Sequence, residues 1–147
     1  MAPGNVLMVC LGNICRSPLA HGIFQELAAQ HNIKVDSAGT ANYHKGASPD
    51  PRSREIASKN GIDISQQQAR QFVVEDFDLF DYIYVMDHSN QDNVLRLARN
   101  DQDRAKVRLL LGDTEVEDPY YGGKEGFAVV FDKIQKACQQ ILEQWKN

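Results

Sequence analysis

The sequence predicts an α/β fold: a doubly wound, four-stranded parallel sheet with helices on both faces, formed by a single domain over residues 1–147. Short apolar runs alternate with longer segments in which apolar residues recur every three or four positions, as in successive β-α units. The first run, VLMV, is wholly apolar, which is typical of a strand buried on both faces of a parallel sheet. The length of 147 residues suits one domain with a sizeable core.

Four segments are predicted to be strands because each is a short run rich in apolar or β-branched residues. They are residues 6–9, 33–37, 81–86 and 107–111. Right-handed crossovers between parallel strands place helices on both faces of the sheet. Ligands of such sheets bind beyond the carboxyl ends of the strands, so a site is expected in the loops that follow them.

Helices are predicted between and after these strands, at residues 18–28, 51–60, 89–99 and 127–145. Pro18 fits a first helical turn, where its missing N–H costs little. Asp50 is a good N-cap for the second helix, and Gly61 is a good C-terminal stop. The last helix has the clearest apolar stripe, which we interpret as core packing rather than as a partner-binding face.

Composition argues against several function classes. A net charge of −4 does not suit a general nucleic-acid surface. No segment approaches the length of a membrane span, and the start MAPGNVLMVC lacks the basic residue of a secretory signal. We therefore expect the three cysteines to be reduced thiols in a cytoplasm.

The residues after the first predicted strand, CLGNICRS, combine a thiol with an anion-binding loop. Cys10 and Arg16 have the spacing C-x5-R, and Ser17 follows. Backbone N–H groups in a strand-to-helix loop can turn inward as a nest, and a guanidinium can hold two phosphate oxygens. The same field favours a thiolate at Cys10, to which Ser17 can donate a hydrogen bond. Gly12 permits tight curvature, and Asn13 tolerates a left-handed backbone.

The three cysteines differ in their surroundings. Only Cys10 has an arginine six residues further on, so it is the candidate nucleophile; the alternative is a small buried residue at a strand end. Cys15 is a candidate resolving thiol, because a neighbouring thiol can convert a sulfenic acid at Cys10 into a disulfide before irreversible oxidation. Its alternative role is to fill space beneath the loop. We assign no function to Cys138.

Asp118 is a candidate general acid. It lies in EDPYYG, after the fourth predicted strand and therefore at the same edge of the sheet as the thiol loop. A phenolate leaving group needs a proton, which a positioned carboxylic acid supplies. Pro119 biases Asp118 towards an extended backbone. The alternative is an ordinary Asp-Pro turn, since Asp50 and Pro51 form such a pair at a helix start.

Six motifs follow one another along the chain: VCLGNICRSP, DSAG, SPDPR, ARQF, DYIYVMD and EDPYYG. In this order and at about this spacing, they resemble the low-molecular-weight protein tyrosine phosphatases over nearly the whole chain. The resemblance implies metal-independent hydrolysis of phosphotyrosine in proteins and of small aryl phosphates, through a cysteinyl-phosphate intermediate. It implies Cys10 as nucleophile, Arg16 as phosphate clamp, Asn13 and Ser17 as loop and thiolate supports, and Asp118 as general acid.

The resemblance also implies the residues that bind and surround the substrate. They are Leu11, Gly12, Asn13, Ile14, Cys15 and Ser17 in the loop, and Tyr43, Tyr120 and Tyr121 around it. Adjacent tyrosines in a Gly-flanked loop can flank a flat substrate ring, with packing in a turn as the alternative for Tyr121. Many relatives carry tryptophan where Tyr43 stands, which implies a different substrate preference here.

A supporting hydrogen-bond network is implied as well. The residue at the position of Ser37 joins the loop asparagine in relatives, often together with a histidine. The nearest matching position here is Gln67, whose amide can also donate and accept. We interpret the histidines as surface or capping residues: His21, His31, His44 and His88. No pair has metal-ligand spacing with cysteine or carboxylate, so we predict no metal and no cofactor.

The sequence argues against two other functions. Arsenate reductases that share the opening motif need two further cysteines near the middle of the chain, and no cysteine lies between Cys15 and Cys138. A non-catalytic phosphate-binding module would lack a nucleophile or an acid, and both are present. Short loops and Tyr43 resemble bacterial relatives, which implies phosphotyrosine proteins such as bacterial tyrosine autokinases as substrates. The aromatic rim suits a monomer or a weak dimer.

Overall fold

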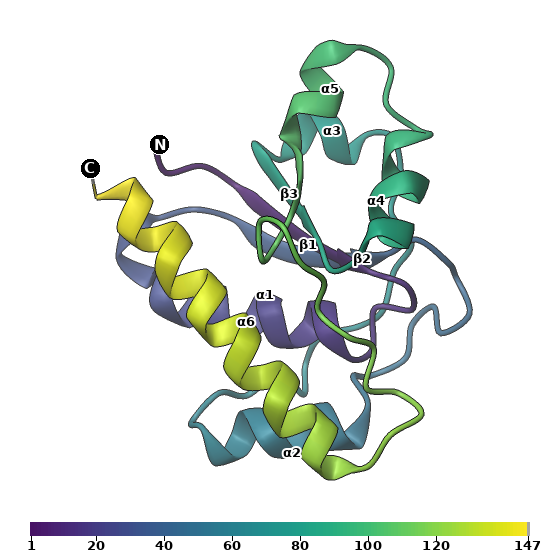
Figure 1. The fold of residues 1–147 in the computed structure, drawn as a ribbon, viewed down its shortest axis with the longest axis vertical. Coiled ribbons are helices and arrows are strands. Elements are labelled where there is room, and N and C mark those ends of the chain that lie inside the picture. The colour runs from purple at the N-terminus through teal and green to yellow at the C-terminus, as the bar shows by residue number, and fades with distance from the viewer. Residues whose placement is uncertain (147) are drawn as a thin grey trace.

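A computed structural model describes residues 1–146. One sheet of four parallel strands has the order β2-β1-β3-β4 (Figure 1). The strands are β1 (Val6–Cys10), β2 (Val35–Gly39), β3 (Tyr82–Val85) and β4 (Val107–Leu109). The chain runs outward from β1 to β2 and then returns to build the sheet on the other side of β1. The strand order therefore reverses between β1 and β3, and ligands bind at such a point.

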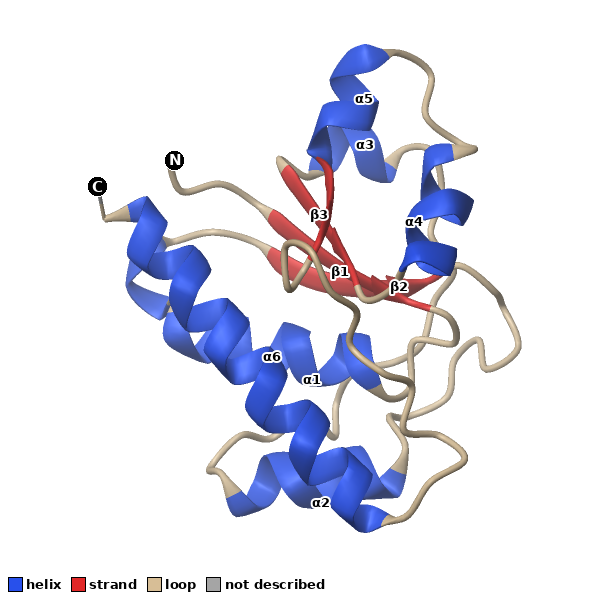
Figure 2. Cartoon of the chain, viewed as in Figure 1, coloured by secondary structure: helices blue, strands red, loops and turns tan. Residues whose placement is uncertain are grey.

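Helices cover both faces of this sheet (Figure 2). They are α1 (Arg16–Leu27), α2 (Pro51–Lys59), α3 (Asp76–Leu79), α4 (His88–Leu95), α5 (Asp101–Lys106) and α6 (Lys124–Trp145), with a short 3₁₀ turn at Ala29–His31. Helices α1 and α6 pack on one face, and α3 and α4 pack on the other. Helix α2 packs against α1 and α6. The predicted doubly wound α/β fold is confirmed.

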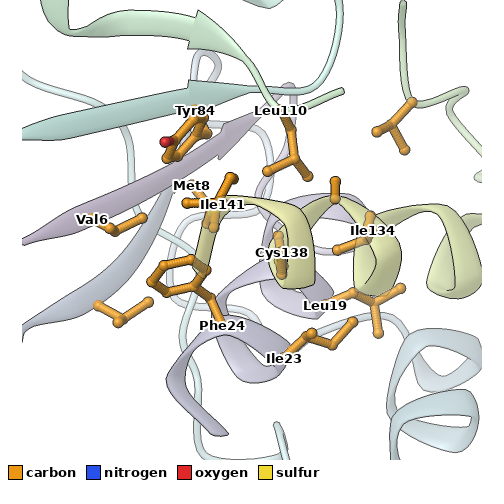
Figure 3. Packing of buried hydrophobic residues seen from close by; sticks show 14 of the residues in the cluster. Val6, Met8, Leu19, Ile23, Phe24, Tyr84, Leu110, Ile134, Cys138 and Ile141 are labelled. Carbon is orange, nitrogen blue, oxygen red and sulfur yellow. The ribbon is translucent and has the colours of Figure 1, made fainter. Parts of the chain in front are cut away.

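Strand β1 is buried from end to end, which explains its wholly apolar sequence. Val6 and Met8 point towards α1 and α6, whereas Leu7 and Val9 point towards the opposite face. Figure 3 shows the first of these layers, in which side chains of α6 interleave with those of α1 and β1. The apolar stripe of α6 is part of this core, as the sequence predicts.

Element ends follow local capping. Asp50 caps α2 by accepting a hydrogen bond from the Arg52 N–H at 2.8 Å, and Pro51 occupies the first helical position. Gly61 has a φ of +77°, the left-handed conformation that ends such a helix region at low cost. These expectations from the sequence are therefore confirmed.

Other boundaries differ from the predictions. Strand β2 begins at Val35 rather than at residue 33, after Asn32 in a left-handed turn (φ 51°). The predicted helix over residues 89–99 ends at Leu95, because a new helix, α5, has its own N-cap in Asn100, which accepts from the Asp103 N–H. Strand β4 ends at Leu109, two residues earlier than predicted. Helix α3 is only four residues long, too short to give a periodic pattern.

Within residues 1–146, no helix combines the length and the apolar character that crossing a membrane requires.

Candidate active site

The loop between β1 and α1 places Cys10 beneath the N-terminus of a helix. Cys10 is the last residue of β1, and α1 begins at Arg16. The Cys10 Sγ lies 3.0 Å from the Ser17 Oγ. Unpaired N–H groups and the helix dipole favour negative charge at this position. The site therefore suits a thiolate and a bound oxyanion together.

Asn13 holds the loop in its conformation. Its backbone has a φ of +58°, in the left-handed region that side chains other than glycine adopt at a cost. Its Nδ2 donates to the Ser17 Oγ at 2.7 Å and to the Ser37 Oγ at 3.0 Å, and its Oδ1 accepts from the Arg70 N–H at 3.0 Å. Because Ser17 accepts from Asn13, its hydroxyl proton is left to donate; the Cys10 sulfur at 3.0 Å is nearer to the Ser17 Oγ than the other acceptor, the Ala38 carbonyl at 3.5 Å.

The histidine of this network comes from an unexpected place. His21, which the sequence analysis assigned to a surface or capping position, is partly buried, and its Nδ1 lies 3.1 Å from the Ser37 Oγ. Gln67, the expected substitute, instead donates its Nε2 to the Pro18 carbonyl at 3.2 Å. The surface assignment of His21 was wrong because one turn of α1 carries its side chain from Ser17 towards β2. No local pattern in the sequence reveals this direction.

Burial controls the charge state of His21. It lowers the pKa of the imidazole below the ordinary value of 6.5; Arg70 lowers it further, whereas Asp36 opposes the shift. Because Ser37 already accepts from Asn13, its hydroxyl can donate to a neutral His21 Nδ1. Hydrogen bonds connect His21 to Cys10 through Ser37, Asn13 and Ser17. Every donor in this chain has an acceptor when the imidazole is neutral.

Arg16 is a buried cation with fixed partners. It is 2% exposed, and its Nη1 donates to the Asp87 Oδ2 at 2.7 Å and to the Val116 carbonyl at 2.9 Å. Burial alone lowers the pKa of Arg16, but the Cys10 thiolate and the Asp87 carboxylate outweigh burial and raise it. The guanidinium therefore stays charged, and its Nη2 is directed towards Asp118, 3.7 Å from the Asp118 Oδ2.

Asp87 was missed as a site residue. It lies two residues after the end of β3, at the edge where the strand order reverses, and its Oδ1 also caps α4 by accepting from the Asn90 N–H at 2.7 Å. The available signal was an acidic residue immediately after the apolar run YIYVM. A carboxylate at that edge is well placed to orient a buried arginine in the loop-to-helix segment that follows the neighbouring strand β1.

Asp118 reaches the same place from a loop that precedes α6. Its side chain is 39% exposed, and its Oδ1 accepts from the Tyr120 N–H at 3.0 Å. The contact with Arg16 joins residues that are about a hundred positions apart in the chain. The carboxyl group can thus meet both solvent and an anion held by the loop.

These residues line one cleft of about 110 Å³. Its lining is Cys10, Leu11, Gly12, Ile14, Cys15, Arg16, Tyr43, His44, Asp118, Tyr120 and Tyr121. The structure therefore brings together all the predicted loop, acid and wall positions except Asn13, Ser17 and Ser37, which lie buried behind the loop. The walls are accessible: Tyr43 is 75% exposed and Tyr121 is 94% exposed.

His44 is a second wall residue that the sequence analysis assigned elsewhere. Its ring lies 6.2 Å from the Tyr120 ring and 6.5 Å from the Tyr43 ring. A Cβ on Gly12 would approach the His44 ring to 2.9 Å, so the loop needs glycine at this position for His44 to pack there. Within residues 1–146, no three His, Cys, Asp or Glu side chains are grouped as metal ligands.

The other two thiols differ from Cys10. Burial, followed by the nearby Asp50 carboxylate, raises the pKa of Cys15 to about 12, so this thiol is protonated at neutral pH. Cys15 packs with Ile14, Ala69 and Phe127, consistent with a space-filling role as well. Cys138 is enclosed in the core, in α6. All three cysteines are free.

Comparison with known proteins agrees with this geometry. The family model described as low molecular weight phosphotyrosine protein phosphatase matches residues 5–147. A Synechocystis sp. protein assigned to the low molecular weight protein-tyrosine-phosphatases is 45% identical over 147 residues, covering 93% of each chain. The low molecular weight phosphotyrosine protein phosphatase of Rattus norvegicus is 41% identical, covering 95% of this chain and 94% of its own.

A solved structure extends the likeness to the fold. The protein tyrosine phosphatase from Entamoeba histolytica superposes with a TM-score of 0.91 at 35% identity, covering 98% of this chain and 97% of its own. A match of this extent covers all four strands, the loop of residues 10–17 (the phosphate loop) and the loop of residues 113–123 that contains Asp118 (the acid loop). The chain therefore belongs to the low molecular weight phosphotyrosine protein phosphatase family.

Proposed function

We propose that this phosphatase works in two covalent steps, with Cys10 as nucleophile, Arg16 as phosphate clamp and Asp118 as general acid and then base. The observation that carries the proposal is the convergence of these three side chains on one cleft, with Arg16 Nη2 3.7 Å from Asp118 Oδ2. A nucleophile, a cation and a proton donor in one cleft match the needs of phosphoryl transfer.

In the first step, the Cys10 thiolate attacks phosphorus in line with the phenolic oxygen. The S–P bond forms, the P–O bond breaks, and Asp118 gives its proton to the departing oxygen. Arg16 and the loop N–H groups stabilise the charge on the three remaining phosphoryl oxygens. Because the Asp87 carboxylate already fixes one side of Arg16, the guanidinium needs little reorganisation.

In the second step, water attacks the phosphocysteine. The Asp118 carboxylate takes a proton from the water, the S–P bond breaks, and inorganic phosphate leaves. The regenerated thiolate accepts a hydrogen bond from Ser17, whose oxygen lies 3.0 Å away. This bond stabilises Cys10 as a leaving group as well as a nucleophile.

The proposed substrates are phosphotyrosine side chains of proteins and small aryl phosphates. The aromatic walls of the cleft can flank a flat ring above the phosphate site. The Entamoeba relative was solved with Hepes, a sulfonate, in its active site, which is consistent with an anion site in this fold. Bacterial tyrosine autokinases are the proposed partners, and a reactive free thiol suits the reducing cytoplasm. We propose a monomer or a weak dimer.

The test is hydrolysis of an aryl phosphate by the parent, Cys10→Ser and Asp118→Ala proteins, with EDTA present. We expect Cys10→Ser to be inactive, and Asp118→Ala to bind substrate but to be slowed on the order of 10²-fold or more with poor leaving groups. Cys138→Ser, in the core away from the cleft, is the matched thiol control. A parent no faster than Cys10→Ser, or one silenced by EDTA, would contradict the proposal.

We also propose that Cys15 protects Cys10 from irreversible oxidation. Peroxide converts the Cys10 thiolate to a sulfenic acid; the Cys15 sulfur then attacks it, the S–S bond forms, and the Cys15 proton leaves with the hydroxyl group as water. Both thiols line the same cleft, which supports the proposal. The parent should regain more activity with reductant than Cys15→Ser after equal peroxide, and equal recovery would refute this role.

A further inference from the structure

The first turn of α2 contacts both loops of the cleft. The Asp50 N–H donates to the Ile14 carbonyl at 2.8 Å, and the Ser53 Oγ donates to the Cys15 carbonyl at 3.3 Å. Between them, Arg52 reaches the opposite loop: its Nη2 donates to the Tyr120 carbonyl and its Nη1 to the Gly122 carbonyl, both at 2.8 Å. One helical turn therefore holds the backbone of the phosphate loop and the backbone of the acid loop.

The guanidinium of Arg52 is itself fixed in place. Its Nε and Nη2 form two parallel hydrogen bonds to the Asp50 carboxylate, each of 3.0 Å. The guanidinium carbon lies 4.4 Å from the centre of the Phe127 ring, at the start of α6. A planar cation that is stacked on a ring and paired bidentately keeps its remaining donors pointing in set directions. Those remaining donors are the ones that hold the acid loop.

Tyr120 links Arg52 to the general acid. The Tyr120 carbonyl accepts from Arg52, while the Tyr120 N–H donates to the Asp118 Oδ1 at 3.0 Å. A single peptide segment therefore transmits the position of Arg52 to the Asp118 carboxyl group. The Asp118 side chain is more exposed than that of Arg16, so fewer neighbours fix its position. The position of Asp118 therefore depends more strongly on the hydrogen bond from the Tyr120 N–H.

We propose that Arg52 is a positioning residue that sets the distance between Asp118 and the phosphate held by the phosphate loop. The proposal rests on the proposed role of Asp118 as general acid. Without the two carbonyl contacts, the acid loop would sample positions in which Asp118 misses the leaving oxygen. Displacement of a catalytic group by about 1 Å can cost on the order of a hundredfold in rate.

The test variant is Arg52→Met, which keeps much of the stem but has no donors. Its kcat/KM, which reports the first step and not hydrolysis of the phosphocysteine, should fall about ten- to a hundredfold for aryl phosphates with poor leaving groups and less than about threefold for one with a strongly activated leaving group. The inhibition constant for inorganic phosphate should change less than about twofold. Asp50 and Ser53 still hold the phosphate loop, through hydrogen bonds that Arg52 does not make.

Lys124→Met is the matched control. Lys124 also connects α2 to α6, through Glu55 at 3.2 Å, but its partner is not a carbonyl of the acid loop. Figure 1 shows α2 beside the N-terminal part of α6. Lys124→Met should retain the parent dependence on the leaving group. An equal change in Lys124→Met and Arg52→Met would mean that Arg52 acts only by joining the two helices, and would overturn the proposal.

Combination with Asp118→Asn separates this proposal from the mechanism on which it rests. If Arg52 acts through Asp118, Arg52→Met should add less than about threefold to the loss in Asp118→Asn for poor leaving groups. Fully additive losses of kcat/KM, or a kcat/KM loss that is the same for all leaving groups, would refute the positioning role. If Asp118→Asn hydrolyses substrates with poor leaving groups as fast as the parent, the proposed mechanism itself is refuted. If Arg52→Met fails to fold by circular dichroism, Arg52→Lys, which lacks the planar fork, is subject to the same comparison.

Discussion

The two loops that form the cleft are built in opposite ways. The phosphate loop, residues 10–17, is held from beneath by Asn13, Ser17, Ser37 and His21, and its arginine is buried against Asp87. The acid loop, residues 113–123, is mostly exposed: buried Val116 anchors its first half through hydrogen bonds with Met86 and Arg16, and the part that carries Asp118 is supported by the Arg52 side chain and by the peptide of Tyr120. The phosphate loop is enclosed by the fold, whereas the Asp118 side of the acid loop lies at the surface.

The difference matches the chemical task of each loop. Charge stabilisation in the transition state depends on donors that are already oriented, so flexibility in the phosphate loop would cost rate directly. A general acid has to exchange protons with water between the two steps and has to admit a protein substrate. The exposed carboxyl group of Asp118 meets both needs. In the proposed mechanism, the cleft therefore combines an enclosed electrostatic site with a solvent-accessible proton donor.

Arg16→Lys is expected to have the largest effect. A lysine cannot clamp phosphate with a planar fork or maintain the same bond to Asp87, so kcat/KM should fall on the order of 10³-fold. Because the lesion is in the charge-stabilising loop, the loss should be similar for good and poor leaving groups in steady-state assays. Arg54→Lys, at an exposed position in α2, is the control. A loss confined to poor leaving groups would contradict the assignment of charge stabilisation to the phosphate loop and of proton donation to the acid loop.

Asn13 variants test how strongly the phosphate loop is held. Asn13→Ala removes three hydrogen bonds and keeps the left-handed strain, so it should lower the free energy of unfolding by about 3 kcal/mol. Asn13→Gly relieves the strain and should be about 1 kcal/mol less destabilised than the alanine variant. Urea unfolding measures both. Equal stabilities of the two variants would show that the left-handed backbone stores no strain.

Tyr121→Ala tests the opposite expectation for the acid loop. The side chain is 94% exposed, so stability should hardly change. Loss of stacking on a substrate ring should raise KM about three- to tenfold with little change in kcat. Val129→Ala, an exposed apolar residue of α6, is the control in the same assays. A drop in stability of the size expected for Asn13→Ala would contradict the contrast between the loops.

The smallest expected effect concerns pH and His21. Unfolded His21 takes up a proton as the pH falls through its ordinary pKa of 6.5, whereas burial lowers the folded pKa, so the folded protein takes up that proton only at lower pH. The unfolded state then binds more protons, and stability falls as the pH drops below 6.5.

His21→Gln should therefore lose less stability than the parent between pH 7 and pH 5, as measured by urea unfolding at each pH. His88→Gln, which changes an exposed imidazole, should follow the parent. If the free energy of unfolding depends on pH equally in His21→Gln and in the parent, the His21 imidazole does not couple the phosphate loop to pH.

Much of the fold was accessible from the sequence because its signals are local. The apolar run of β1, the N-cap of α2 and the stripe of α6 depend on neighbouring residues alone, and all three predictions agree with the structure. The break between α4 and α5 was missed because a capping asparagine inside an apparently continuous pattern gives only a weak signal. The C-x5-R spacing was visible because one short loop contains the thiol and its arginine.

Sequence alone determined the family motifs, the alternation of the four strands with the main helices, and the fact that only Cys10 has an arginine six residues further on, since each depends on spacing within a short segment. Tertiary structure decided which distant groups support them: Asp87 beside Arg16, His21 behind Ser37, and Arg52 beneath the acid loop. Apart from His21 and Ser37, these partners are about 70 residues apart in the chain. Such contacts exist only once the sheet order and helix packing bring the carboxyl edge of the strands and the first turn of α2 together.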